Sequence, residues 1–162
     1  MTESPLRFVE YAVTLAEAPK EVSLTIAVSN CVFRCSGCHS PYLWEDKGEL
    51  LLPALPGLIR RYSGLISCVC FMGEGQNPSE ERQALATVQE HGLKTCLYSG
   101  CDSIQPFVPL LPLLDYLKIG HYDEKLGGLD SRTTNQRFYR VENGQLIDET
   151  KQFQRRKEED DV

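Results

Sequence analysis

The sequence predicts a single α/β domain with a largely parallel sheet. Two observations support this fold class: short apolar segments alternate with helical segments along the chain, and the connections between them are short. The chain has 162 residues, a length typical of one domain. A leading strand followed by about four strand–helix steps is too short for a closed eight-unit barrel. We therefore expect one domain, residues 1–162, that forms an open or partial βα barrel.

The first two strands are expected within residues 7–28. A stretch of aromatic and β-branched residues is followed by a turn at residues 17–20 and by an alternating segment from Val22 to Val28. This second strand leads directly into a cysteine-rich loop. Ligands of α/β folds bind beyond the carboxyl ends of strands, so this loop is the first place to look for a site.

The middle of the chain alternates helices and strands. Asn77 suits a helix N-cap, Pro78 suits the first turn and Gly92 suits the end of the same helix. The expected elements, in order, are a helix at 50–62, a strand at 65–71, a helix at 78–91, a strand at 93–98, a proline-broken helix at 104–114 and a strand at 116–119.

The C-terminal part is predicted to be a hairpin. Two short strands, residues 137–141 and 145–148, flank Asn143-Gly144, which is the strongest short hairpin signal. Residues 151–162 are almost entirely charged, and we expect a mobile tail there.

Composition excludes several classes of partner. The formal net charge is -6 and the pI is about 5.1, so the chain has no basic footprint for nucleic acid or for an anionic membrane surface. No apolar run approaches the length needed to cross a bilayer, and no secretory signal precedes the first strand. A reducing cytoplasmic location is the simplest interpretation for a chain with seven cysteines.

Three of the cysteines form the most informative motif. Cys31, Cys35 and Cys38 are spaced C-x3-C-x2-C, and thiolates this close can ligate one iron–sulfur cluster. Three thiolates on a four-iron cube leave one iron open to another ligand. Zinc held by the same thiolates and His39 is an alternative, although zinc ligand pairs are usually separated by two or more residues. Disulfides and buried free thiols are the remaining alternatives.

The segment Cys31-Val-Phe-Arg-Cys-Ser-Gly-Cys-His-Ser-Pro-Tyr-Leu-Trp44 resembles the cluster motif of radical S-adenosylmethionine (radical SAM) enzymes. It is most similar to the activating enzymes of glycyl radical enzymes, and among them to the activases of anaerobic ribonucleoside-triphosphate reductases. The resemblance implies a partial barrel of radical SAM type, a [4Fe-4S] cluster on the three cysteines and S-adenosylmethionine on the open iron. Reductive cleavage of the cofactor would yield a 5′-deoxyadenosyl radical.

The same resemblance implies partners. The 5′-deoxyadenosyl radical would remove a hydrogen atom from a glycine of the partner reductase, and a low-potential donor such as flavodoxin or ferredoxin would supply the electron. The cofactor carries the difficult chemistry, so the chain needs no general acid, base or nucleophile of its own. We expect neither a nucleic-acid nor a membrane partner.

Several residues are candidates for binding S-adenosylmethionine. The loop Met72-Gly73-Glu74-Gly75 lies where radical SAM proteins carry a Gly-Gly-Glu-Pro-like stretch, with Met72 and Gly75 departing from that pattern. The alternative is a strand-to-helix turn with an incidental glutamate. The remaining candidates are Gly37 for close approach of the adenine, Ser99 for a ribose or carboxylate, and His39 beside a ligand cysteine.

A further group of residues is expected to contact the pocket or the partner. Tyr42 and Trp44 are expected to shield the cluster from water. Asn135-Gln136-Arg137 resembles an Asn-Gln-Arg segment of the reductase activases, and its many donors suit a peptide backbone or a carboxylate. The alternative is a polar entry to the hairpin. Cys101 is a spare thiol to which no role is assigned.

Two other functions remain open at this stage. The chain could activate a different glycyl radical enzyme or modify a peptide. It could also be a non-catalytic iron–sulfur or zinc module, which would neither bind nor cleave S-adenosylmethionine.

Overall fold

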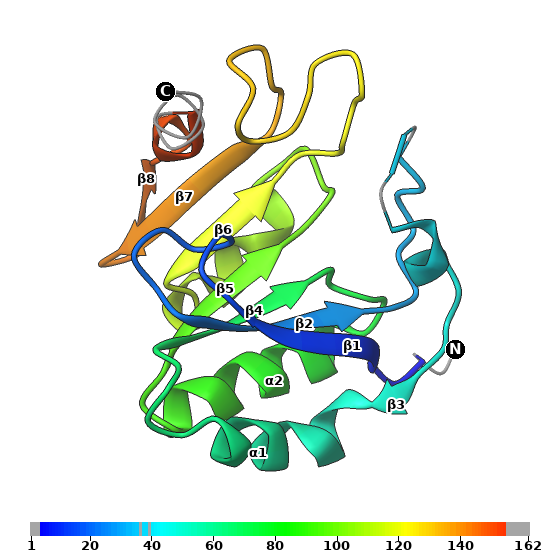
Figure 1. Cartoon of the computed structure of the whole chain (residues 1–162), viewed down its shortest axis with the longest axis vertical. Coiled ribbons are helices and arrows are strands. Elements are labelled where there is room, and N and C mark those ends of the chain that lie inside the picture. Colours follow the sequence, from blue (N-terminus) through cyan, green and yellow to red (C-terminus); the bar gives the residue numbers. More distant parts are fainter. Residues whose placement is uncertain (1–3, 36, 39, 155–162) are drawn as a thin grey trace.

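A computed structural model describes residues 4–35, 37–38 and 40–154 of the chain. Within these residues it has a mixed α/β fold with one open sheet of eight strands in the order β3-β1-β2-β4-β5-β6-β7-β8 (Figure 1). The strands are β1 (Arg7–Thr14), β2 (Ser23–Val28), β3 (Glu49–Leu50), β4 (Cys68–Met72), β5 (Lys94–Tyr98), β6 (Tyr116–Ile119), β7 (Arg137–Glu142) and β8 (Gln145–Asp148). The predicted α/β class is confirmed.

The centre of the sheet is parallel and its two sides are antiparallel. Strands β2, β4, β5 and β6 pair in parallel, as expected for successive strand–helix units. On one side β1 pairs antiparallel with β2 and with β3, and on the other side β7 pairs antiparallel with β6 and with β8. The four parallel strands therefore end at the same edge of the sheet.

Helices cover one face of this sheet. The α-helices are α1 (Leu51–Arg61) and α2 (Pro78–Glu90), and the 3-10 helices are η1 (Pro41–Trp44) and η2 (Gln105–Leu113). Helix α2 begins as predicted, because the side chain of Asn77 accepts a hydrogen bond from the Glu80 backbone N–H at 3.1 Å. Figure 1 shows α1 and α2 together beneath the sheet.

Two segments differ in detail from the sequence-based expectation. The segment expected to form a broken helix at 104–114 is a 3-10 helix, because Pro109 and Pro112 supply no backbone N–H for α-helical hydrogen bonds. The strand expected from Leu65 begins only at Cys68, after a turn closed by hydrogen bonds to the Tyr62 carbonyl.

The C-terminal hairpin is confirmed. Asn143 and Gly144 connect β7 to β8 with positive φ angles of 52° and 76°, as a type I′ turn requires. Residues 151–154 of the expected mobile tail are helical instead, and the Phe153 ring lies 4.9 Å from that of Phe138. Burial of an aromatic side chain stabilises this turn in spite of its charged neighbours. The rest of the tail lies outside the described residues.

The two faces of the sheet bury different side chains. The face covered by α1 and α2, here called the helix face, is aliphatic and aromatic. Its central members are Leu24, Ile26, Val28, Val69, Phe71, Leu97, Leu117 and Ile119. The opposite face, here called the cavity face, carries a smaller cluster made of Ala18, Cys68, Cys70, Cys96, Tyr116 and Phe138. Successive residues of each strand alternate between these two faces.

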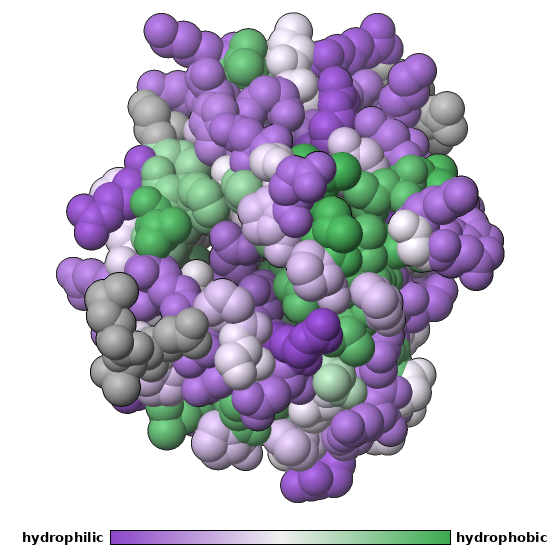
Figure 2. All heavy atoms as spheres, turned by 180° about the vertical axis from the view of Figure 1, so that it is seen from behind, coloured by the Kyte–Doolittle hydropathy of each residue, from purple (hydrophilic) through white to green (hydrophobic). Residues whose placement is uncertain are grey.

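The surface is mixed in character. No helix in the described part of the chain is long and apolar enough to span a membrane. Seen from behind, apolar surface is divided by hydrophilic side chains (Figure 2). Single exposed hydrophobic side chains of this kind are usual on a protein surface.

Candidate functional site

A cavity of about 510 Å³ opens on the cavity face at the carboxyl ends of the parallel strands. All three cysteines of the motif, Cys31, Cys35 and Cys38, line it. Its floor comes from the ends of the central strands, namely Ala27, Val28, Met72, Gly73, Tyr98, Ser99, Gly100, Lys118 and Gly120. The expectation of a site beyond the carboxyl ends of the strands agrees with this position.

The cysteine loop is held in place by its backbone and by one aromatic ring. The backbone N–H of Cys31 donates to the Leu43 carbonyl at 2.9 Å, which ties the start of the loop to η1. Phe33 packs against the end of β5, where a Cβ added to Gly100 would lie 2.8 Å from the ring. A side chain at position 100 would therefore displace the loop.

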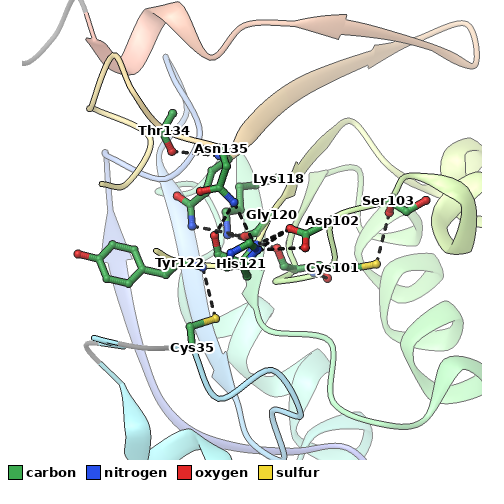
Figure 3. A network of polar contacts seen from close by, with 12 residues as sticks. Cys35, Cys101, Asp102, Ser103, Lys118, Gly120, His121, Tyr122, Thr134 and Asn135 are labelled. Atoms are coloured by element: carbon green, nitrogen blue, oxygen red, sulfur yellow. Dashed lines mark hydrogen bonds and ion pairs between the residues drawn. The ribbon is translucent and has the colours of Figure 1, made fainter. Parts of the chain in front are cut away.

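Two of the three sulfurs accept backbone hydrogen bonds. The Tyr122 N–H donates to Cys35 Sγ at 3.3 Å, and the Ser40 N–H donates to Cys38 Sγ at 3.4 Å. The first of these bonds joins the cysteine loop to the segment after β6, as Figure 3 shows. Hydrogen bonds to sulfur favour the thiolate form and tune the potential of iron–sulfur centres.

Of the loop Met72-Gly73-Glu74-Gly75, the first two residues line the cavity with the cysteines and the last two do not. Glu74 instead lies beside α2, and Gly75 packs against Leu6, whose Cδ2 would be 2.5 Å from an added Cβ. Burial raises the pKa of Glu74, and a hydrogen bond with Ser99 partly offsets that effect. Glu74 therefore reaches the cavity through Ser99, which does line it.

The Asn-Gln-Arg segment is divided among three environments. Gln136 is buried, lines the cavity and donates to the Gly120 carbonyl at 3.4 Å. Asn135 Nδ2 donates to the His121 carbonyl at 3.1 Å, and its buried Oδ1 has no partner in the described part of the chain. Arg137 is exposed and lies 3.9 Å from Asp148 on the neighbouring strand.

The three other predicted residues near the cysteines, Trp44, Gly37 and His39, differ in their relation to the cavity. Trp44 lines it, and its buried Nε1 has no acceptor among the described residues. Gly37 lies against Glu124, whose Oε2 would be 2.6 Å from an added Cβ, and does not line the cavity with Trp44. His39 lies outside the described residues.

Lys118, the charged residue in the floor of the cavity, was not among the predicted site residues. It is 8% exposed, and its Nζ donates to the carbonyls of Gly120 at 2.8 Å and Ser99 at 3.2 Å. Burial lowers the pKa of Lys118 to about 8, while the charges of Cys35, Asp102 and Cys31 act in the opposite direction. A lysine within an apolar strand segment was the available signal.

Glu10 was not predicted, and it pairs with Tyr42, one of the two aromatic residues expected to cover the cluster. Both line the cavity, and the Tyr42 hydroxyl donates to the Glu10 carboxylate. This hydrogen bond raises the pKa of Tyr42, with a smaller contribution from burial. The bond connects η1 to β1 and closes one side of the mouth.

The seven cysteines, all in the described part of the chain, have free thiols. Within the described ranges, no three His, Cys, Asp or Glu side chains converge closely enough to hold a single metal ion. A four-iron cluster is larger than one ion, and its thiolates need to surround it without meeting at one point. The donor set of three thiols in one cavity, with backbone N–H groups at two sulfurs, fits such a cluster.

Cys101 does not line this cavity. Its thiol donates to the Ser103 carbonyl at 3.5 Å, and its side chain packs against the main core.

The chain matches no protein-family model, no curated protein and no solved structure.

Proposed function

We propose that the chain is a radical SAM activase that generates a glycyl radical on an anaerobic ribonucleoside-triphosphate reductase. The observation that supports this function best is that Cys31, Cys35 and Cys38 line one cavity at the carboxyl ends of four parallel strands. In this proposal the open sheet is a partial barrel of radical SAM type, and the protein works in a reducing cytoplasm.

In this proposal Cys31, Cys35 and Cys38 would hold a [4Fe-4S] cluster, which when bound and reduced would supply the electron for cleavage of S-adenosylmethionine. The N–H groups of Tyr122 and Ser40 hold the sulfurs of Cys35 and Cys38 in orientation, at 3.3 and 3.4 Å. Fixed donors of this kind limit the reorganisation that electron transfer requires.

The remaining cavity residues bind and orient S-adenosylmethionine. Gly73 lies close to the chain at the end of β2, since an added Cβ would be 3.0 Å from the Val28 carbonyl. Its lack of a side chain leaves backbone groups accessible to the amino end of the cofactor. Ser99 follows the neighbouring strand β5 and Gln136 precedes β7, and they place a hydroxyl and an amide in the same cavity.

The macromolecular substrate would enter through the open side of the cavity. The sheet does not close on itself, because β3 and β8 are its two free edges. Trp44 and Tyr42 line the cavity, and their rings can pack against the partner's glycine loop. The partner would thereby exclude water from the radical.

The test begins with anaerobic reconstitution of the cluster, reduction with dithionite and addition of S-adenosylmethionine. We expect 5′-deoxyadenosine and methionine, and then an organic radical in the electron paramagnetic resonance (EPR) spectrum of an added anaerobic ribonucleotide reductase. A chain that loads four irons and accepts an electron, yet releases no 5′-deoxyadenosine with or without the reductase, would contradict the proposal.

Two observations favour alternative functions. Glu74 and Gly75 do not line the cavity, and this favours a non-catalytic iron–sulfur or zinc module for electron transfer or scaffolding. Only Gln136 of the Asn-Gln-Arg segment lines the cavity, so activation of another glycyl radical enzyme or modification of a peptide is the alternative for the partner. Glu74→Ala distinguishes the proposed activase from a non-catalytic module. It should weaken S-adenosylmethionine binding only if the loop that contains Glu74 serves the cofactor through Ser99.

A further inference from the structure

Lys118 places a positive charge below the cysteine loop. It lies in the short central strand β6 and lines the same cavity as Cys31 and Cys35. Its side chain is 8% exposed, a burial at which a charge is costly unless an opposite charge or several hydrogen bonds compensate for it.

The hydrogen bonds of Lys118 go to neutral carbonyl groups, so they supply no counter-charge for the ammonium. An ammonium has three N–H donors, and two of them reach the carbonyls of Gly120 and Ser99. Its Nζ also lies 5.8 Å from the centre of the Tyr98 ring, a weaker interaction. Among the described residues, no carboxylate forms an ion pair with Lys118.

The carboxylate near this strand end is already engaged elsewhere. Asp102 is exposed and pairs with His121, with 2.8 Å between Asp102 Oδ1 and the ring Nδ1. The charges that most favour the ammonium form of Lys118 include the thiolates of Cys35 and Cys31, which act together with Asp102. Besides Glu10, which accepts a hydrogen bond from Tyr42, the acidic side chains that line the cavity are those of the cysteine motif.

One short segment fixes the ammonium and a ligand sulfur relative to each other. Gly120 accepts from Lys118 Nζ through its carbonyl, and two residues later the Tyr122 N–H donates to Cys35 Sγ (Figure 3). Gly120 has a φ of 104°, and an added Cβ would lie 2.9 Å from the Cα of Gln136. The backbone between Lys118 and Cys35 is thus closely packed and has little freedom to move.

We propose that Lys118 is a positioning residue whose ammonium is the counter-charge of the cysteine site and raises the reduction potential of the cluster held there. This inference rests on the proposed function and deepens it. In the step concerned, a low-potential one-electron donor is oxidised and the cluster gains one electron. No bond of the protein forms or breaks, and the ammonium keeps its protons throughout.

Coulomb's law gives the size of the effect. With an effective protein dielectric of about 20, unit charges about 10 Å apart change an equilibrium by more than tenfold. We therefore expect that removal of the Lys118 charge lowers the ratio of reduced to oxidised cluster at least tenfold at a fixed solution potential. For a one-electron couple, tenfold corresponds to about 59 mV towards more negative potential.

The experiment is an EPR-monitored redox titration of the reconstituted full chain without S-adenosylmethionine. Lys118→Gln removes the charge but retains an amide that can donate to the carbonyls of Gly120 and Ser99. Lys118→Arg retains the charge. Lys20→Gln is the matched control, because Lys20 is exposed in the turn before β2, at the opposite end of that strand from the cysteine loop.

The expected result is a more negative potential for Lys118→Gln, with Lys118→Arg and Lys20→Gln close to the unmodified chain. An unchanged reduction potential for Lys118→Gln, in protein with a full complement of iron, would overturn the inference. This holds even if the variant binds S-adenosylmethionine more weakly, because Lys118 would then contact S-adenosylmethionine without acting on the cluster. Failure of the unmodified chain to load iron would instead overturn the proposed function.

Iron loading provides a second readout if a variant does not form the cluster. Loss of iron from Lys118→Gln and Lys118→Met, with normal loading of Lys118→Arg, would support a counter-charge that the anionic cluster needs for binding. Loss of iron from all three variants would overturn the inference, because the position would then tolerate no change of shape.

Discussion

The helix face and the cavity face of the sheet are built from the same strands, yet they carry different side chains. In β4, Val69 and Phe71 point to the helices, whereas Cys68 and Cys70 point to the other face. In β6, Leu117 belongs to the core on the helix face and Lys118 lines the cavity. The alternation of a strand thus separates the residues that stabilise the fold from those that can do chemistry. We expect substitutions on the two faces to affect different properties.

The largest expected effect is loss of the cluster from the cavity face. Cys35→Ala should abolish iron binding and S-adenosylmethionine cleavage, because two thiolates cannot hold the cube in place. Iron analysis and the visible absorption of the reconstituted protein measure this loss. Cys101→Ala is the control and should load iron normally, since Cys101 lies outside the cavity. Equal loading of the two variants would show that the cysteine motif is not the ligand set.

The next effect concerns stability and compares neighbours on β5. Leu97 and Cys96 are both fully buried, but they face opposite sides of the sheet. Leu97→Ala should lower the free energy of unfolding by about 2–5 kcal/mol because it opens a cavity beneath the helices. Cys96→Ala removes one sulfur and should cost about 1 kcal/mol. Urea unfolding under reducing conditions measures both values, and equal losses would remove the distinction between the faces.

One carboxyl group departs from the apolar character of the helix face. Burial raises the pKa of Glu81 to about 8, and its Oε1 has no hydrogen-bond partner in the described chain. The folded protein therefore binds a proton that the unfolded chain releases near its ordinary pKa of about 4.3. The contribution of Glu81 to the free energy of unfolding is therefore fully present at pH 4 and is lost as the pH rises towards 8.

Glu81→Gln should remove this dependence. We expect it to raise the free energy of unfolding at pH 7 by about 3–4 kcal/mol and to leave it unchanged near pH 4. Urea unfolding of both proteins from pH 4 to pH 8 gives the comparison. A constant difference between them over that range would mean that the Glu81 carboxyl has the same pKa in the folded and unfolded states.

The smallest expected effect is at the start of α2. Asn77→Ala removes the N-cap hydrogen bond to the Glu80 N–H and should cost about 1 kcal/mol, whereas Asn77→Ser keeps an acceptor and should cost less. Neither substitution should alter iron loading, since α2 lies on the helix face. A change in iron loading for Asn77→Ala would reveal coupling between the two faces.

The sequence alone determined the local elements of this protein. Asn77-Pro78 and Gly92 set the ends of α2, and Asn143-Gly144 set the hairpin, because caps and tight turns depend on residues a few positions apart. The apolar segments identified the parallel strands, and the spacing of the cysteines singled out the loop after β2 as the candidate site. These signals are short in range and can be read from one segment at a time.

Tertiary structure decided which distant residues share the site. Lys118, Gln136 and Cys35 come together only because β6 pairs with β5 and the segment after β6 donates a hydrogen bond to the cysteine loop. Glu74 and Gly75 immediately follow Gly73 but do not share its cavity, since the turn into α2 carries them towards the helices. Strand order and the direction of side chains at strand ends depend on packing between segments far apart in the chain, which no local pattern records.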